Sequence, residues 1–430
     1  MVENPLLSTL MERGFVKQTT PLDALNTHLC ADKKPTLYLG FDATAPSLHV
    51  GNLMGLMAMR WAKDCGYSII ILLGGGTTRI GDPSGKNKTR QILDDETIRQ
   101  NIAGIRRCVE KLIDNKDSTV HFVNNADWLD TLKYTEFLRD IGVHFSVNRM
   151  IKFDSVQSRL DRDSALTFTE FNYILLQSYD FLELYNRYGC TIQMGGSDQW
   201  GNIVSGVDLV RRMAGVQTHG ITWPLLQTAS GDKMGKSVHG AVWMDESLLS
   251  PYDYWQFWRN VDDRDVVRFL KIFTLLPMKD IQAFEDVSGV DLVHAKKLLA
   301  DNATALIHGS DVLTSIHRSA EKAFSADLSG LSEAECQHWP SYCMDASELE
   351  KGLFLIDVLV ALGFASSRSM ARKKIREGAV KIAEQTIHDD LYQITQDIFG
   401  DQYFVALSLG RKKKALLKMV NLSHGGGDVQ

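Results

Sequence analysis

The chain has 430 residues, of which 44% are hydrophobic and 23% charged, as in an ordinary globular protein. This length allows roughly two to four domains and excludes a small fold that needs disulfides or a metal for stability. No apolar stretch approaches the ~18 residues of a membrane span, and the first residues do not have the pattern of a signal peptide, so we expect a cytoplasmic protein.

Charge is distributed unevenly along the chain. The net charge of -6 alone argues against a nucleic-acid partner. Residues 351–430, however, carry twelve Lys and Arg against eight Asp and Glu, a balance of +4 that leaves -10 on the rest. This asymmetry indicates a basic appendage that meets a polyanion. The six cysteines form no C-x-x-C pair, which predicts reduced thiols and no zinc site.

The predicted elements begin with a strand, a helix and a strand, at residues 36–42, about 51–64 and 67–73. This order is a βαβ unit and predicts an α/β fold with a parallel sheet. Further elements are predicted in chain order: helices at about 94–114, 131–141 and 168–186, a strand at 190–194, and a helical region from 252 to about 324. The turn-rich, acidic stretch 326–350 predicts a linker, and the last segment a small α+β unit.

The first candidate for chemistry lies where the strand 36–42 gives way to a helix. A turn with Pro46 is followed by His49, Gly51 and Asn52, which open the helix. Unpaired N–H groups and the helix dipole suit a phosphate there, and glycine lets a ligand approach the backbone. For an isolated H-x-G, a histidine in a capping turn is the commoner explanation.

The second candidate is Gly231–Ser237, in which Lys233 and Lys236 can hold a polyphosphate as mobile point charges. Alone, this stretch is better explained as a solvated hairpin. A P-loop, G-x-x-x-x-G-K-[ST], is disfavoured. Its first glycine is replaced by Ser230 when the motif is aligned on Gly235-Lys236, and by Ile80 when it is aligned on Gly85-Lys86.

Two more stretches combine polar groups with apolar neighbours. Tyr173, Gln177 and Asp180 follow helical spacing and share one face, which suits either a pocket for a small polar ligand or the wet face of an amphipathic helix. Residues 195–202 follow a strand, where α/β proteins bind ligands, and Asp198 can accept hydrogen bonds from ribose. A plain turn is the alternative for this stretch and for residues 81–85.

The order and separation of these stretches resemble class I aminoacyl-tRNA synthetases, whose signatures are written HIGH and KMSKS. Here they read His49-Val50-Gly51-Asn52 and Lys233-Met234-Gly235-Lys236-Ser237. Further stretches resemble the bacterial tyrosyl enzymes specifically, over nearly the whole chain: residues 38–44, 81–85, 145–148, 155–159 and 195–202. Residues 365–382 are similar to a small RNA-binding domain that also occurs in a ribosomal small-subunit protein.

This resemblance implies four regions: a Rossmann-like catalytic domain (1–246), an α-helical anticodon-side domain (247–325), a linker (326–350) and a small basic RNA-binding domain (351–430). It also implies roles for individual residues. Tyrosine would be bound by Tyr38, Asp82, Tyr173, Gln177, Asp180 and Gln199. ATP would be bound by Gly40, Asp42, His49, Gly51, Asn52, Gly196, Asp198, Lys233, Lys236 and Ser237. The catalytic groups would be Thr44, His49, Lys233 and Lys236, and tRNA would meet Arg368, Arg372, Lys373 and Arg376.

The implied reaction joins L-tyrosine to ATP, accompanied by Mg²⁺, and then moves tyrosine to the 3′-terminal ribose of tRNA(Tyr), in a homodimer. No protein-bound metal is implied. Leu39 stands where many relatives carry a cysteine that touches the ribose, so that contact is not expected here. Three alternatives stay open: a tryptophanyl enzyme, which the pair Tyr38 and Asp180 argues against, another small nucleotidylyltransferase, and an RNA-binding protein without catalysis.

Overall fold

The computed structural model describes residues 4–84, 93–114, 118–162, 165–229, 231, 234–237, 240–325, 340–345, 348–349, 352–383, 385–400, 404–410 and 413–419. The chain divides into two compact units, Met1–Ser310 and Asp311–Gln430.

The first unit is built on a six-stranded sheet with the order β1-β6-β5-β2-β3-β4. Its strands are β1 (Gln18–Thr19), β2 (Thr36–Asp42), β3 (Ile69–Gly74), β4 (Val120–Asn124), β5 (Cys190–Gly196) and β6 (His219–Trp223). Only the β1–β6 pair is antiparallel. The chain passes from β2 to β3 on one side, whereas β5 pairs with β2 on the other. The carboxyl ends of β2 and β5 therefore form a switch point, where open α/β sheets bind ligands.

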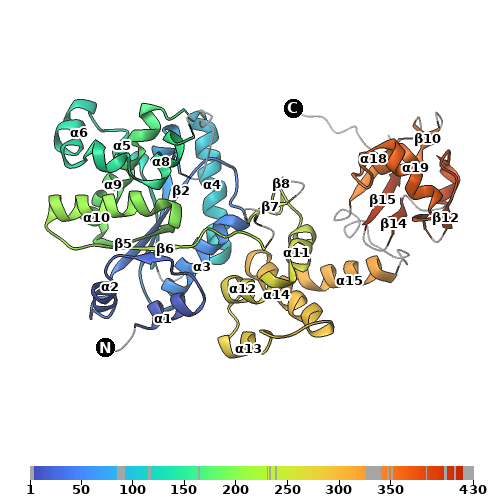
Figure 1. Ribbon diagram of the computed structural model, residues 1–430, viewed down its shortest axis with the longest axis horizontal. Helices are drawn as coiled ribbons and strands as arrows, with labels where there is room; N and C mark the ends of the chain where they lie inside the picture. The colour runs from blue at the N-terminus through green and yellow to red at the C-terminus, as the bar shows by residue number, and fades with distance from the viewer. Residues whose placement is uncertain are drawn as a thin grey trace. The chain divides into compact units, whose positions relative to one another are not determined.

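Helices cover both faces of this sheet (Figure 1). The long helices α9 (Phe168–Tyr188) and α10 (Trp200–Ala214) pack against β5, while α3 (Val50–Asp64) packs against β2 and β3. The other elements before residue 250 are α1 (Pro5–Glu12), α2 (Leu22–Leu29), η1 (Thr77–Arg79), α4 (Asp95–Leu112), α5 (Ala126–Leu129), α6 (Tyr134–Asp140), η2 (Gly142–His144), α7 (Val147–Met150), α8 (Asp154–Leu160), η3 (Ser197–Gln199), β7 (Lys236–Ser237) and β8 (Gly240–Ala241).

Most elements expected from the sequence are present. The strand 36–42 is β2, and β3 and β5 lie within two residues of their expected bounds. The expected helices correspond to α3, α4, α6 and α9. Sequence patterns missed β4 and β6, because each is only five residues long and carries histidine, asparagine or threonine instead of a continuous apolar run. The predicted class, α/β with a parallel sheet, is confirmed.

The region after residue 250 is helical, as expected, and packs on the sheet domain. It contains α11 (Pro251–Arg259), η4 (Asp263–Asp265), α12 (Val266–Phe273), α13 (Met278–Gln282) and α14 (Val290–His308), with α12 in contact with α3 and α14 in contact with α4. Arg13 reinforces this packing. Its buried guanidinium lies over the ring of Trp61 from α3 and donates to the carbonyls of Lys271, Thr274 and Leu276 at the end of α12.

The second unit contains α15 (Val312–Ser325), β9 (Ser341–Met344), β10 (Leu353–Phe354), α18 (Leu355–Ala361), α19 (Arg368–Arg376), β11 (Val380–Ile382), β12 (Gln385–Ile387), β13 (Gln393–Ile394), η5 (Gln396–Phe399), β14 (Phe404–Leu409) and β15 (Lys413–Met419). Five strands form a sheet of order β12-β11-β14-β15-β9. The linker expected over 326–350 needs correction at residues 341–344, which form β9 and pair with β15. Burial of Met344 in the core of this unit favours this pairing.

No helix in the part of the chain that the structure describes is long and apolar enough to cross a membrane.

Candidate active site

A cavity of about 380 Å³ opens at the carboxyl ends of β2 and β5. It brings together fourteen of the residues predicted from the sequence: Tyr38, Gly40, Asp42, Thr44, His49, Gly51, Asn52, Asp82, Tyr173, Gln177, Asp180, Gly196, Asp198 and Gln199. Leu39 also lines it, although its side chain cannot form a hydrogen bond. Four separate stretches of the sequence therefore meet at one place.

Asp180 lies fully buried on α9 and is held by two donors. Asn125 Nδ2 donates to one carboxylate oxygen at 2.9 Å, and Trp128 Nε1 donates to the other at 2.7 Å. Burial raises the pKa of Asp180 to about 7, although both hydrogen bonds favour the charged form. Each oxygen keeps a lone pair for a further donor. The fixed carboxylate is thus a strong acceptor for a ligand hydroxyl.

Two other buried polar atoms at the cavity have no hydrogen-bond partner among the described residues. Within the described part of the chain, neither Tyr38 Oη nor Gln193 Oε1 has a hydrogen-bond partner, and both residues line the cavity. Burial, and next the charge of Asp180, raises the pKa of Tyr38 well above its usual range, so its phenol stays a neutral donor. Since unpaired buried polar groups are costly, a polar ligand that pairs with them gains affinity.

Tyr173 couples α9 to the end of β2. Its hydroxyl donates to Asp42 Oδ2 at 3.1 Å, while Thr77 Oγ1 donates to Asp42 Oδ1 at 2.7 Å. Burial raises the pKa of Tyr173 well above its usual range, and the Asp42 carboxylate adds to the shift. Two hydroxyl donors therefore hold the Asp42 carboxylate beside the cavity.

A network of amides holds Gln177, Gln199 and Asp82. Asn202 Nδ2 donates to Gln177 Oε1 at 2.7 Å and to Gln199 Oε1 at 3.1 Å. Gln199 Nε2 in turn donates to Asp82 Oδ2 at 2.9 Å, and the backbone N–H of Ser84 donates to Asp82 Oδ1. These bonds fix which amide atom each glutamine presents, so the site is organised before a ligand binds.

The first signature forms the N-terminus of α3. His49 is the N-cap residue, and Asn52 Oδ1 accepts the His49 N–H at 3.2 Å, which completes a capping box. His49 therefore stands in a helix-capping turn, which was the commoner explanation for this motif in the sequence. The Nδ2 atom of Asn52 is not used in the capping box and can meet a ligand. A side chain at Gly51 would meet the Met234 carbonyl oxygen at 3.0 Å, so glycine is needed where the two signatures meet.

The second signature can be followed only in part. Lys233 lies outside the described residues. Lys236 and Ser237 form β7, which pairs with β8 in a short hairpin. Gly235 has φ +93 and lies so close to α3 that an added Cβ would be 2.7 Å from Gly51 N. A P-loop opens a helix, whereas this stretch forms a hairpin, which agrees with the mismatch in its sequence.

The basic residues predicted to meet tRNA lie on α19 in the second unit. Ala371 and Ile375 are buried in the core of that unit, while the basic side chains of the helix are exposed. Several of the cations have acidic neighbours: Arg368 pairs with Asp357 at 2.6 Å, and Arg376 with Asp390 at 2.8 Å.

The sequence analysis missed three cavity residues and one support: Thr77, Asn125 and Gln193 line the cavity, and Trp128 holds Asp180. Asn125 directly follows β4, a strand that the sequence patterns did not reveal. Gln193 lies inside the predicted strand 190–194, where its inward position could have been read from the alternation of side chains.

Comparison with known proteins agrees with this geometry. The sequence model of the family "tRNA synthetases class I (W and Y)" matches residues 31–325, and that of the "Tyrosine--tRNA ligase SYY-like C-terminal domain" matches residues 333–417. The chain is 47% identical over 413 residues to a tyrosine–tRNA ligase of Wolbachia pipientis, covering 96% of this chain and 97% of the relative. It is 47% identical over 419 residues to one of Methylocella silvestris, covering 96% and 97%.

Solved structures add the fold. A C-terminally truncated mitochondrial tyrosyl-tRNA synthetase of Aspergillus nidulans is 30% identical, with a TM-score of 0.66, over 74% of this chain and 94% of that one. A tryptophanyl-tRNA synthetase of Encephalitozoon cuniculi, 12% identical with a TM-score of 0.54 over 70% and 86%, shares the fold alone. With its two family matches and near full-length relatives, the chain belongs to the tyrosine–tRNA ligases of the class I tRNA synthetase family.

Proposed function

We propose that this chain activates L-tyrosine with ATP in the cavity at β2 and β5 and then transfers it to tRNA(Tyr). The observation that supports this most is that the buried Asp180 carboxylate and the N-terminus of α3 line one cavity. The first suits the side chain of tyrosine, and the second suits a phosphate.

Tyrosine is placed by groups that match each part of it. Its phenol O–H donates to Asp180 and meets Tyr38, whose hydroxyl has no partner in the described part of the chain. Its α-ammonium is held by Asp82, Tyr173 and Gln177, and Gln199 lies at its carboxylate. A phenylalanine would leave the buried Asp180 and Tyr38 without their partner, which supplies the selectivity.

ATP occupies the side of the cavity that the first signature lines. Gly40, Asp42, Gly51, Asn52, Gly196 and Asp198 surround the nucleotide, with Asp198 at the ribose. His49, Thr44, Lys233 and Lys236 are assigned to the phosphates, with Ser237 in a supporting role. Mg²⁺ arrives with ATP, since it favours phosphates and water over a protein cage. Among the described residues, no group of three or more His, Cys, Asp or Glu could hold a metal.

The chemistry requires positioning more than proton transfer. The tyrosine carboxylate, with a pKa of about 3.5, is already ionised at neutral pH. Its oxygen attacks the α-phosphorus, the bond to the bridging oxygen breaks, and pyrophosphate leaves. Charge grows on the phosphoryl oxygens and the leaving group, where the helix N-terminus, His49 and the two lysines stabilise it. A terminal ribose hydroxyl of the tRNA then attacks the carbonyl carbon of tyrosyl-adenylate and releases AMP.

We assign tRNA contact to Arg368, Arg372, Lys373 and Arg376 on α19. The triple variant R372A/K373A/R376A should lower kcat/KM for tRNA charging at least about tenfold and weaken its salt dependence, because each lost cation removes a phosphate contact. Tyrosine activation should stay within about twofold, and the exposed Lys279→Ala serves as a control for lost charge in the first unit. Undiminished charging by the triple variant would remove α19 from the tRNA site.

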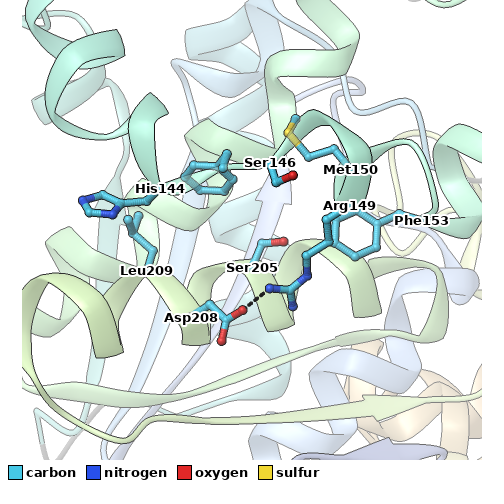
Figure 2. Close-up of a pocket in the computed structure, with 9 residues that line it drawn as sticks. His144, Ser146, Arg149, Met150, Phe153, Ser205, Asp208 and Leu209 are labelled. Atoms are coloured by element: carbon cyan, nitrogen blue, oxygen red, sulfur yellow. Dashed lines mark hydrogen bonds and ion pairs between the residues drawn. The ribbon is translucent and has the colours of Figure 1, made fainter.

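The functional molecule is proposed to be a homodimer that uses residues 134–168. This segment exposes large apolar side chains, with Val143 71%, Phe168 67% and Val147 60% accessible. Within this segment, α7 is connected to α10 by an ion pair between Arg149 and Asp208, beside a pocket of about 20 Å³ (Figure 2). Exposed apolar groups gathered on one segment favour association of two copies.

Sedimentation tests this assembly. The double variant V147D/F168D should change the species at micromolar concentration from twice the chain mass to the single-chain mass of 48.2 kDa. Val290→Asp, at an 84% exposed valine in the helical region, is the matched control and should leave the dimer intact. A double variant that still sediments as a dimer would place the interface elsewhere.

A cytoplasmic location is proposed with this function. Five cysteines in the described part of the chain, Cys30, Cys65, Cys108, Cys190 and Cys343, are free thiols, as expected of a protein from a reducing compartment.

A further inference from the structure

The loop that carries the second signature has a near arm, which contains Gln227 and Ala229, and a far arm, which contains Gly235 and Val242. The far arm is attached to the first signature. The Gly235 carbonyl accepts the Val242 N–H at 2.9 Å, and the Val242 carbonyl accepts the Val50 N–H at 2.9 Å. Two backbone hydrogen bonds therefore connect Gly235 to the start of α3. The close approach of Gly235 to Gly51 leaves no room for even one added carbon, so a shift of this arm changes the surroundings of His49.

The near arm of the same loop is attached to the helical region instead. The Ala229 N–H donates to Asp265 Oδ2 at 2.7 Å, and Arg268 Nη2 donates to the Gln227 carbonyl at 2.5 Å. Arg268 Nη2 also donates to Asp265 Oδ1 at 2.6 Å, which joins the two anchors. Asp265 ends η4 and Arg268 lies on α12, so both come from the region that packs on α3.

These anchors are built more firmly than an ordinary surface pair. The Asp265 side chain is only 4% accessible. One of its oxygens accepts the Ala229 N–H of the loop, and the other accepts a hydrogen bond from Arg268. Bonds between a charged group and the backbone are the stronger kind, and a buried carboxylate fixes its partners closely. The two arms also bond to each other, through the Met234 N–H and the Leu226 carbonyl at 3.0 Å.

We propose that Asp265 and Arg268 are positioning residues for adenylate formation. They fix the near arm at Gln227 and Ala229, so that the far arm keeps Gly235 against His49 and Gly51 while ATP reacts. Neither residue lines the cavity, so they act through the loop and through the start of α3. This inference rests on the proposed function, in which that side of the cavity binds ATP.

Steady-state pyrophosphate exchange, with ATP and tyrosine varied separately, tests the inference. Asp265→Ala should lower kcat/KM for ATP about 10- to 100-fold, whereas KM for tyrosine stays within about twofold, because Tyr38 and Asp180 belong to β2 and α9 and not to this loop. Asp265→Asn should recover most of this loss, since its amide oxygen still accepts the Ala229 N–H. Arg268→Ala should give a smaller loss, and the double variant D265A/R268A less than the product of the two single losses, because the residues share one network.

Arg264→Ala is the matched control. Arg264 lies in the same turn, is 68% exposed and pairs with Asp262 instead of the loop, so its loss should leave ATP kinetics unchanged. Unchanged ATP kinetics in folded D265A, or in R268A should D265A not fold, would overturn the inference. So would equal losses for ATP and tyrosine that follow a lowered melting temperature. Absence of tyrosine-dependent exchange in the wild-type chain would instead contradict the proposed function itself, and the inference with it.

Discussion

Asp180→Asn is expected to lower kcat/KM for tyrosine activation by about 100- to 1,000-fold, from the loss of a charged, buried acceptor for the phenol. Asn125 and Trp128 both donate hydrogen bonds to this side chain. In the asparagine variant, the amide NH₂ group must therefore lie opposite one of these two donors, where no hydrogen bond can form. Asn125 cannot easily rotate to relieve this, since its Oδ1 already accepts the Gly76 N–H at 2.8 Å. The substituted site therefore loses both charge and orientation.

The same variant should remove a characteristic pH dependence of stability. Burial raises the folded-state pKa of Asp180 to about 7, above its value in the unfolded chain. The folded protein thus holds a proton that the unfolded chain releases, and the stabilisation present below about pH 4 is lost as pH rises through 7. The stability of wild type minus that of D180N should fall by about 4 kcal/mol between pH 4 and 8, from roughly three pKa units.

Urea unfolding at several pH values, together with exchange kinetics, measures both effects. Wild-type kcat/KM for tyrosine should rise through pH 7 as Asp180 ionises in the empty site, and D180N should lack this rise. Glu110→Gln, at an exposed carboxylate on α4 that pairs with Arg106, is the matched control and should behave as wild type. If D180N retains activity within threefold, Asp180 is not the acceptor of the phenol.

His49→Ala is expected to slow adenylate formation by about 100- to 1,000-fold, the usual loss for one donor to a developing charge. Tyrosine affinity should stay within about twofold. The reason is distance: at ~3.3 Å per strand residue, Asp42 at the end of β2 lies about 13 Å from Tyr38, and the turn to His49 begins beyond Asp42. His49 is therefore far from the group that meets the phenol. Lys233→Ala should have the same kinetic signature, since it too is assigned to the phosphates.

Rapid-quench measurement of adenylate formation, with tyrosine binding measured separately, distinguishes this role from a purely structural one. His49→Asn is the informative companion, because asparagine can cap α3 as histidine does and can still donate a hydrogen bond. It should recover the stability of the capped helix and part of the rate. Equal losses of rate and of tyrosine affinity in H49A would contradict a role specific to the transition state.

How much of this site the sequence could reveal depended on how long a regular helix or strand surrounds each residue. The spacing of Tyr173, Gln177 and Asp180 alone puts them on one face of the long helix α9, but it suited a pocket and the wet face of a helix equally well. For His49 a capping turn was the commoner explanation, and the resemblance to the synthetase family selected both sets for the site. Their assembly into one cavity follows from the switch point, which pattern reasoning anticipates once β2 and β5 are known to be neighbours.

The residues that stayed hidden act through tertiary contacts. Asn125 directly follows β4 and Trp128 lies on α5. These elements have five and four residues, too few for a periodic pattern, yet the two side chains orient Asp180. Asp265 looks like any acidic residue of a helical region until the loop at Ala229 is placed beside it. The strand β9 was hidden for a similar reason, since its pairing with β15 joins segments far apart in the sequence.

Amino-acid-dependent exchange of labelled pyrophosphate into ATP, run with all twenty amino acids, is the most direct test of this account. We predict exchange with tyrosine and with no other amino acid, because only tyrosine pairs with Asp180 and Tyr38 while fitting the cavity. Exchange with tryptophan instead would contradict the assignment of the phenol-binding group and leave the fold intact. A folded protein that supports no exchange with any amino acid would contradict the proposed activity.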